Sequence, residues 1–143
     1  MLSIVGIIPA RYHSTRFKGK ALANIAGKPM IEWTYRQSKK AKILEKVIVA
    51  TDDKRIFHTV KNFGGEAWLT SGKHKSGTDR IAEVARKMHL SKDAIIVNIQ
   101  GDEPLIKPVI ITQLVRPLLK DKSLNMTTMS YRIRKKEEIN NAI

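Results

Sequence analysis

A chain of 143 residues, 42% of them hydrophobic, is long enough to bury the core of one domain. It contains no cysteine, which excludes a disulfide framework, a thiolate nucleophile and a cysteine-based zinc site. Its apolar runs are too short to cross a bilayer and its first residues lack a signal-peptide pattern, so we expect a cytoplasmic protein without membrane insertion. The net charge of +14 invites a nucleic-acid interpretation, but many cations fall at expected helix ends, where Lys and Arg are common.

The first apolar run leads into a strongly basic loop. Residues 3–8 are rich in β-branched side chains and are bounded by Pro9, which predicts a buried strand. No Asp or Glu precedes Glu32, and the loop after the strand carries four cations: Arg11, Arg16, Lys18 and Lys20. At the carboxyl edge of an α/β sheet, where such folds bind ligands, this loop would neutralise a polyphosphate. A solvated basic turn is the alternative interpretation.

Helical and strand patterns alternate through the rest of the chain. Helices are predicted from Pro29 in the first turn to about Lys40, around residues 56–63, around residues 81–88 with Thr78 as the N-cap, and after Pro108. Strands are predicted over residues 46–51, 66–70, 93–99 and 125–132. Because short connections join alternating strands and helices, we expect an α/β fold with a Rossmann-like, doubly wound, mostly parallel sheet and helices on both faces.

Asp102 follows one of these strands, in the turn Gln100-Gly101-Asp102-Glu103-Pro104. Its carboxylate is expected at the same sheet edge as the basic loop, where it would repel a polyphosphate unless a cation lay between them. Magnesium commonly takes one or two carboxylates together with phosphate oxygens, so Asp102 is our predicted metal ligand. The alternative is an Asp that caps the next turn. For the pair Asp52-Asp53 we prefer the capping interpretation, because Asp at a strand end commonly caps the following helix.

The candidate residues supply positioning, charge neutralisation and a metal ligand. They lack the Ser/His/Asp nucleophile elbow, and no zinc spacing occurs among the four histidines. Phosphoryl and nucleotidyl transfer need positioning, charge neutralisation and a metal ion more than they need a covalent nucleophile. The residues therefore favour a magnesium-dependent enzyme that acts on a nucleoside triphosphate, built as a single nucleotide-binding α/β domain over residues 1–143.

Five stretches carry a more specific signal, and they occur in this order: IIPARYHSTRFKGKAL, AGKPMIEW, VIVATDD, FGGEAWLTSGKHKSGTDRIAE and IVNIQGDEPLI. Together they resemble the 3-deoxy-manno-octulosonate cytidylyltransferase (CMP-Kdo synthetase) family across most of residues 1–115. The combination of PARYxSTR, HxSGTDR and QGDEP is specific, although each alone would be weak. The resemblance implies a nucleotide-diphospho-sugar transferase-like fold and transfer of CMP from CTP to Kdo, with release of pyrophosphate, for lipopolysaccharide biosynthesis.

The resemblance also implies roles for individual residues. Arg11, Arg16 and Lys20 correspond to triphosphate ligands, and Asp102 to the first of two magnesium-binding aspartates. The implied catalytic residues are Lys20, Arg11 and Asp102. The remaining CTP-binding residues are Pro9 and Ala10 beside the cytosine, Ser76 and Gly77 as its readers, Arg80 as a support of their loop, and Gln100 as a nucleotide or sugar contact.

Two departures from the family pattern stand out. Lys18 replaces the proline of the family's FPGK or LPGK, which loosens the loop and adds a charge. Family members also continue well beyond residue 143, into segments that supply the second aspartate, much of the Kdo pocket and the homodimer interface. The chain therefore resembles an apparently truncated N-terminal part of a cytidylyltransferase. If it were the whole protein, we would expect CTP binding with little turnover.

Two alternatives stay open at this point. One is a cytidylyltransferase for another sugar acid, such as 8-amino-Kdo or a sialic acid. The other is a non-catalytic basic module that binds nucleotides or nucleic acid. Specific nucleic-acid binding is not expected, because the sequence shows no RNA-binding motif and no aromatic stacking platform.

Overall fold

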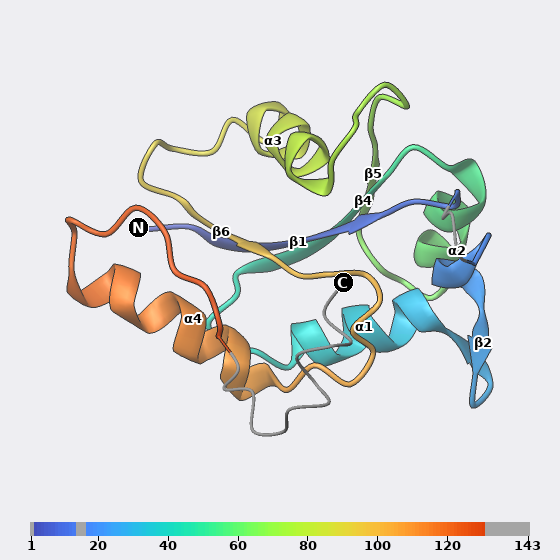
Figure 1. Cartoon of the computed structure of the whole chain (residues 1–143), viewed down its shortest axis with the longest axis horizontal. Coiled ribbons are helices and arrows are strands. Elements are labelled where there is room, and N and C mark those ends of the chain that lie inside the picture. Colours follow the sequence, from blue (N-terminus) through green and yellow to red (C-terminus); the bar gives the residue numbers. More distant parts are fainter. Residues whose placement is uncertain (1, 14–16, 131–143) are drawn as a thin grey trace, which may run out of the picture.

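The computed structural model describes residues 2–13 and 17–130. Within these residues, four strands form a parallel sheet in the order β5-β4-β1-β6 (Figure 1). The strands are β1 (Ile4–Ala10), β4 (Lys46–Thr51), β5 (Ala67–Leu69) and β6 (Ile95–Asn98). The chain moves outward from β1 to β4 and β5, and then returns to the other side of β1 as β6. This reversal makes the sheet doubly wound, as predicted.

Helices cover both faces of the sheet. The long helices are α1 (Met30–Lys39), α2 (Lys54–Asn62), α3 (Gly77–Lys87) and α4 (Pro108–Lys120). In Figure 1, α3 lies on one side of the sheet, whereas α1 and α4 lie on the other. Apolar residues of α1, α2 and α4, such as Ile31, Ile56 and Ile111, join the larger core cluster. On the opposite face, Ile81 and Val84 of α3 pack with residues of β1 and β4.

The two central strands, β1 and β4, are buried on both faces, which explains why their sequences are continuous apolar runs rather than alternating ones. In β4, Val47 and Val49 face the larger cluster, while Ile48 and Ala50 face the cluster under α3. Strand β1 extends past its predicted end, since Pro9 lies within it and pairs with Ala50. A proline is tolerated there because β6 pairs with β1 only from Ile4 to Ile7.

Two helix starts differ from the prediction. Helix α1 begins at Met30, and Pro29 is its N-cap in an extended conformation. Helix α3 is capped by Ser76, whose side chain accepts a hydrogen bond from the Asp79 amide, and not by Thr78, which lies inside the helix. The cap is earlier because Gly77 and Thr78 already take helical geometry. The capping interpretation of Asp53 is confirmed, since its side chain accepts from the amides of Arg55 and Ile56.

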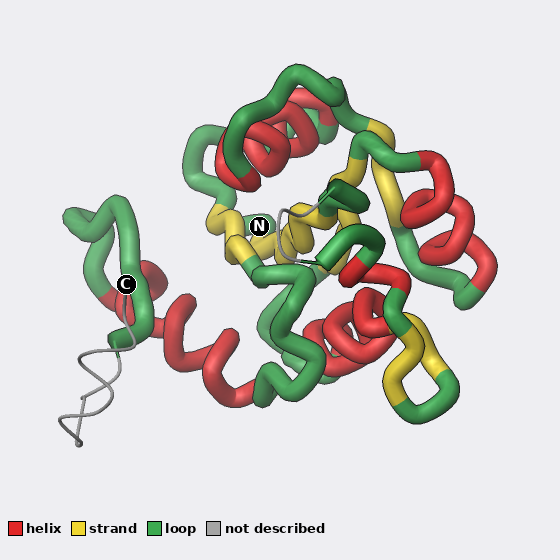
Figure 2. Tube along the Cα trace, turned by 45° about the vertical axis from the view of Figure 1, so that its right-hand side comes forward, coloured by secondary structure: helices red, strands yellow, loops and turns green. Residues whose placement is uncertain are grey.

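Three short elements between the basic loop and α1 were not predicted. They are a 3-10 helix η1 (Lys20–Leu22) and the two-residue strands β2 (Asn24–Ile25) and β3 (Lys28–Pro29). The strands form an antiparallel hairpin, which Figure 2 shows as a projecting loop beside α1. Ala26 and Gly27 both have positive φ in its turn, the geometry of a two-residue hairpin.

The predicted strand at 125–132 is wrong over its described part. Residues 125–130 form no strand and continue as loop beyond α4 (Figure 2). The Thr127 hydroxyl donates to the carbonyl of Leu114 at 2.7 Å, which ties the segment to α4 rather than to the sheet. Met126 and Met129 are exposed, so neither methionine belongs to the buried core. Residues 131 and 132 lie outside the described residues.

None of the helices in the described part of the chain has the length and apolar character needed to cross a membrane.

Candidate functional site

A polar cavity of about 400 Å³ lies where β1 and β6 end. These are the two strands between which the winding direction reverses, and doubly wound sheets bind ligands at this point. The cavity is lined by residues from β1, the basic loop, the start of α1 and the turn after β6: Pro9, Ala10, Arg11, His13, Phe17, Lys20, Ala21, Met30, Gln100, Gly101 and Asp102. The fold therefore brings the basic loop and the Asp102 turn together, although they are far apart in sequence.

Lys20 and Asp102 contact each other across the cavity. The Lys20 ammonium donates to Asp102 Oδ2 at 2.8 Å, and both side chains are about half exposed, at 44% and 50%. An exposed ion pair of this kind contributes little to stability, because water already solvates both charges. The pair is thus available to exchange partners, the ammonium for a phosphate oxygen and the carboxylate for a cation.

The turn after β6 leaves little room for a side chain at position 101. A Cβ there would lie 3.1 Å from the Pro9 carbonyl oxygen, which belongs to the backbone of β1. The Gly101 carbonyl also accepts a hydrogen bond from the Thr34 hydroxyl at 3.1 Å. Since Thr34 lies on α1, the turn is held between β1 and α1, and this fixes the position from which Asp102 projects.

The base of the basic loop is closed by contacts around Tyr12. Gly19, with φ +74°, donates its amide to the Tyr12 carbonyl at 2.8 Å. The Arg55 guanidinium lies 3.3 Å from the centre of the Tyr12 ring, a cation–π contact. Arg55 also donates to both carboxylate oxygens of Asp53, the N-cap of α2. These hydrogen bonds lower the pKa of the Asp53 carboxyl below its ordinary value. These contacts set where Lys20 leaves the loop.

Asp102 is the only acid among the described cavity-lining residues. Across residues 2–13 and 17–130, no group of three or more His, Cys, Asp or Glu side chains is arranged to hold a metal ion. A single carboxylate suits magnesium when phosphate oxygens and waters supply the other ligands. The donor set therefore fits a metal ion that is bound together with a polyphosphate.

The predicted base-reading residues lie beside the cavity rather than in its lining. Ser76 caps α3, and a Cβ on Gly77 would lie 3.2 Å from Pro9 Cγ. Because Pro9 lines the cavity, the start of α3 packs directly against its wall. Arg80 is 1% exposed and lies behind this wall, where it contacts the Thr70 hydroxyl and, at 3.3 Å, Asp52.

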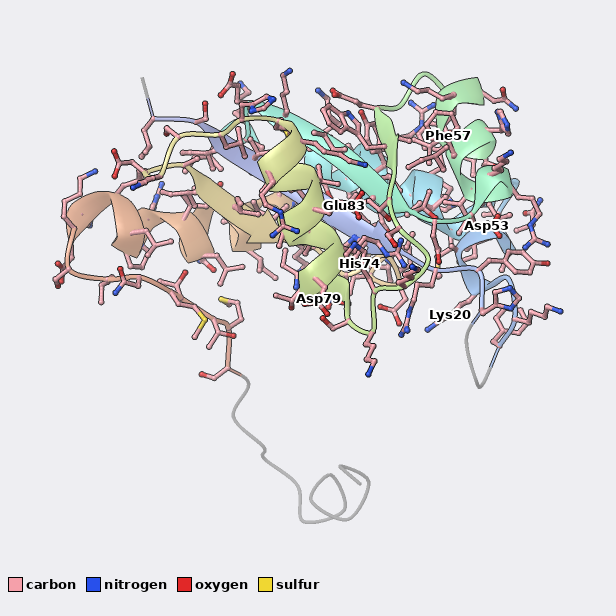
Figure 3. All side chains as sticks on the ribbon, turned by 90° about the horizontal axis from the view of Figure 1, so that it is seen from above. Lys20, Asp53, Phe57, His74, Asp79 and Glu83 are labelled. Atoms are coloured by element: carbon pink, nitrogen blue, oxygen red, sulfur yellow. The ribbon has the colours of Figure 1, made fainter. Side chains whose placement is uncertain are left out.

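A second polar cluster joins α3 to the segment before it. Glu83 accepts hydrogen bonds from the Ser71 amide at 2.9 Å, contacts His74 Nε2 at 2.5 Å and pairs with Lys87 at 2.6 Å. Figure 3 shows Glu83 and His74 next to each other beside α3, away from Lys20. The hydrogen bonds from Lys87, the Ser71 amide and His74 lower the pKa of Glu83 to about 2. This carboxylate was not a candidate in the sequence, because its partners come from a loop whose path the sequence does not show.

The structure thus gathers six of the predicted site residues in one cavity: Pro9, Ala10, Arg11, Lys20, Gln100 and Asp102. Ser76 and Gly77 lie at its edge, Arg80 lies behind it, and Arg16 is outside the described residues. Sequence reasoning did not select the lining residues His13, Phe17, Ala21, Met30 and Gly101. His13 and Phe17 lie between the cations of the basic loop, and this place in the sequence could have marked them as candidate lining residues.

Comparisons with known proteins agree with this geometry. A family model described as cytidylyltransferase matches residues 5–143. The 3-deoxy-manno-octulosonate cytidylyltransferase of Geotalea daltonii is 55% identical over 133 residues, which cover 93% of this chain and 51% of that protein. Its counterpart in Syntrophus aciditrophicus is 50% identical over 139 residues, with coverages of 97% and 56%. The resemblance seen in the sequence motifs is confirmed, and the chain spans about half the length of these relatives.

Solved structures give the same result for the fold. A CMP:2-keto-3-deoxy-manno-octonic acid synthetase in complex with CTP matches with a TM-score of 0.80 and 43% identity, covering 85% of this chain and 49% of that one. A cytidylyltransferase from Leptospira borgpetersenii matches with a TM-score of 0.74 and 25% identity, with coverages of 85% and 51%. The predicted Rossmann-like fold is confirmed by these likenesses.

Proposed function

This chain belongs to the cytidylyltransferase family, and on that premise we propose that it forms the nucleotide-binding part of an enzyme that transfers CMP from CTP to Kdo. The observation that carries the proposal is the meeting of Lys20 and Asp102 in one cavity at the reversal point of the sheet. A cation for phosphate and a carboxylate for a metal ion are the two groups that nucleotidyl transfer needs at this place.

In the proposed reaction, the 2-hydroxyl of Kdo attacks the α-phosphorus of CTP and releases its proton to the solvent. The bond from that phosphorus to the bridging oxygen breaks, and pyrophosphate leaves with the electron pair. Lys20 stabilises the charge that develops near the α-phosphate, while Arg11, and Arg16 by family resemblance, bind the outer phosphates. Gln100 contacts the nucleotide or the sugar acid, and Pro9 and Ala10 border the cytosine.

Magnesium is the proposed cofactor. Asp102 would hold it, and the ion would neutralise the triphosphate when bound. For this to happen, the Lys20 ammonium must give up Asp102 Oδ2, and the arriving phosphates provide its replacement acceptor. Two of the three predicted catalytic residues, Lys20 and Asp102, would therefore exchange their shared ion pair for separate contacts, the ammonium with a phosphate oxygen and the carboxylate with the metal ion.

Kdo is the proposed acceptor because the relatives with 50–55% identity are named as Kdo cytidylyltransferases. The comparisons do not favour 8-amino-Kdo, a sialic acid or a nucleic-acid module. The cytoplasmic location and the homodimer expected from the family stay predictions.

Calorimetric titration with CTP, UTP and ATP, with and without magnesium, tests the proposal. We expect a preference for CTP that strengthens with magnesium. The variants Lys20→Ala and Asp102→Asn should each weaken Mg·CTP binding by about tenfold or more, because each removes a charge-assisted contact.

Two matched variants control for the loss of charge alone. Lys120→Ala removes an exposed cation at the end of α4, and Asp93→Asn removes an exposed acid before β6. Both should bind Mg·CTP like the unmodified chain. Unchanged affinity in both site variants would contradict the assignment of the cavity.

A further inference from the structure

Two side chains of α3 hold the segment before that helix: Arg80 contacts the Thr70 hydroxyl and the Ser71 carbonyl, and Glu83 binds further along the segment. Glu83 is only 16% exposed and takes three donors: the Ser71 amide, His74 Nε2 and the Lys87 ammonium. Two of these donors, from Ser71 and His74, belong to the segment 70–76. Lys87 also donates to the carbonyl of Leu69 at 3.1 Å, so the same cluster reaches the end of β5.

This anchored segment ends at the wall of the nucleotide cavity. Its last residue, Ser76, caps α3, and the next residue, Gly77, lies against Pro9. The segment is therefore attached at one end to β5, along its length to Glu83, and at the other end to a residue that lines the cavity. The contacts of Glu83 and the wall of the cavity are thus joined by a few consecutive residues, from Ser71 to Gly77.

We propose that Glu83 is a positioning residue for base recognition: it holds the segment 70–76 so that Ser76 and Gly77 meet the nucleobase while the phosphates bind elsewhere in the cavity. This inference rests on the proposed function, since it takes the cavity to be a CTP site. It adds a residue that neither the cavity lining nor the predicted site contains.

The chemistry requires a carboxylate at this position. Two ionised oxygens accept hydrogen bonds from all three donors at once. Glutamine has one carbonyl oxygen and a donating amide group, so in Glu83→Gln at least one of the three donors faces another donor. The segment then loses part of its attachment, while Lys20, Arg11 and Asp102 keep their own supports on other elements.

The test compares base discrimination with phosphate binding. Affinities of Glu83→Gln for CTP, UTP and inorganic tripolyphosphate, each with magnesium, are measured by calorimetry. We expect the preference for CTP over UTP to fall by about tenfold, because base recognition loses the equivalent of one well-placed hydrogen bond. Affinity for tripolyphosphate should stay within about twofold, a split that general destabilisation would not produce.

Glu45→Gln is the matched control, since Glu45 is an exposed acid that directly precedes β4. It lies at the amino end of that strand, whereas the cavity lies at the carboxyl ends of β1 and β6. It should leave all three affinities unchanged. Amide hydrogen exchange adds a readout without ligand: the Ser71 amide should exchange faster in Glu83→Gln and not in Glu45→Gln.

The outcomes separate the two proposals. If the unmodified chain prefers CTP and Glu83→Gln keeps that preference, the positioning role is overturned and the proposed function stands. If Glu83→Gln loses tripolyphosphate affinity to the same extent as CTP affinity, the role in base recognition is also overturned. Equal affinity of the unmodified chain for CTP and UTP would overturn the proposed function itself, and faster Ser71 exchange would then report only a structural tie.

Discussion

Single residues in this molecule act through partners that are distant in sequence. Lys20 and Asp102 are 82 positions apart and form an ion pair, and Gly101 is packed against the backbone of Pro9. Each of these contacts joins the end of one strand or its loop to the turn after β6. The cavity therefore depends on a few close approaches that tolerate little added volume.

Gly101→Ala is expected to destabilise the chain by about 1–3 kcal/mol, because the added Cβ would approach the Pro9 carbonyl oxygen, which cannot move without displacing β1. Urea unfolding at equilibrium measures this change. Gly72→Ala is the control, since its Cβ would meet Asp52 Oδ2 at 3.6 Å, an ordinary contact. Equal stability of the two variants would contradict the packing argument.

The acid sensitivity of the chain should depend on Glu83. Its pKa in the folded chain is about 2, below the ordinary 4.5, so its carboxylate stabilises the fold above pH 4.5 and this contribution is lost progressively as the pH falls to about 2. We expect a contribution of about 1–2 kcal/mol, reduced from the full shift because Lys87 is half exposed and its charge is screened.

Thermal unfolding of the unmodified chain and of Glu83→Gln between neutral pH and about pH 3 checks this prediction, because glutamine does not titrate. The stability difference between the two chains should be largest at neutral pH and should shrink in acid. A difference that is independent of pH would show that the carboxylate charge contributes nothing.

At the scale of elements, α3 connects the hydrophobic core to the candidate site. Its apolar residues Ile81 and Val84 pack on the sheet, its first residues meet the cavity wall, and Arg80 and Glu83 hold the preceding segment. One helix thus connects the core to the predicted base-reading residues. Its starting point matters, because a shift of its first turn would move Gly77 away from Pro9.

The cap of α3 gives a prediction at this scale. Ser76→Ala should cost about 1 kcal/mol, because it removes the acceptor for the Asp79 amide. Thr78→Ala should change stability by less than about 0.5 kcal/mol, since Thr78 is exposed within the helix. Denaturant unfolding of both variants decides between the two candidate caps, and a larger effect at Thr78 would restore the sequence-based prediction.

For the whole molecule, the doubly wound order of the sheet decides where ligands bind. The reversal between β1 and β6 opens the edge that holds the cavity. The net charge of +14 acts over the entire surface and attracts any polyanion. Two kinds of binding are therefore expected, one local and selective, the other diffuse and dependent on salt.

Salt should separate them. Binding of a single-stranded oligonucleotide, followed by fluorescence anisotropy, should weaken steeply between about 50 and 200 mM salt, because it depends on released counterions. The preference for Mg·CTP over Mg·UTP should persist over the same range. Oligonucleotide binding that exceeded CTP binding at the higher salt would favour the nucleic-acid module instead.

The sequence by itself determined the alternation of helices and strands, the family resemblance and most of the cavity. These signals are local: apolar periodicity defines each element over consecutive residues, and motifs such as PARYxSTR and QGDEP occupy single loops. The error at residues 125–130 has the same origin, since a strand candidate read from consecutive residues does not show whether a neighbouring strand exists to pair with it.

Only the tertiary structure decided which loops meet. The pairing of Lys20 with Asp102, the Tyr12–Arg55 contact and the three donors around Glu83 each join different loops or elements. Their geometry depends on the order and register of the strands, which the packing of all the helices fixes together. The sequence states directly which residues are neighbours along the chain. Residues on different loops become neighbours only when the helices and strands have packed into the core.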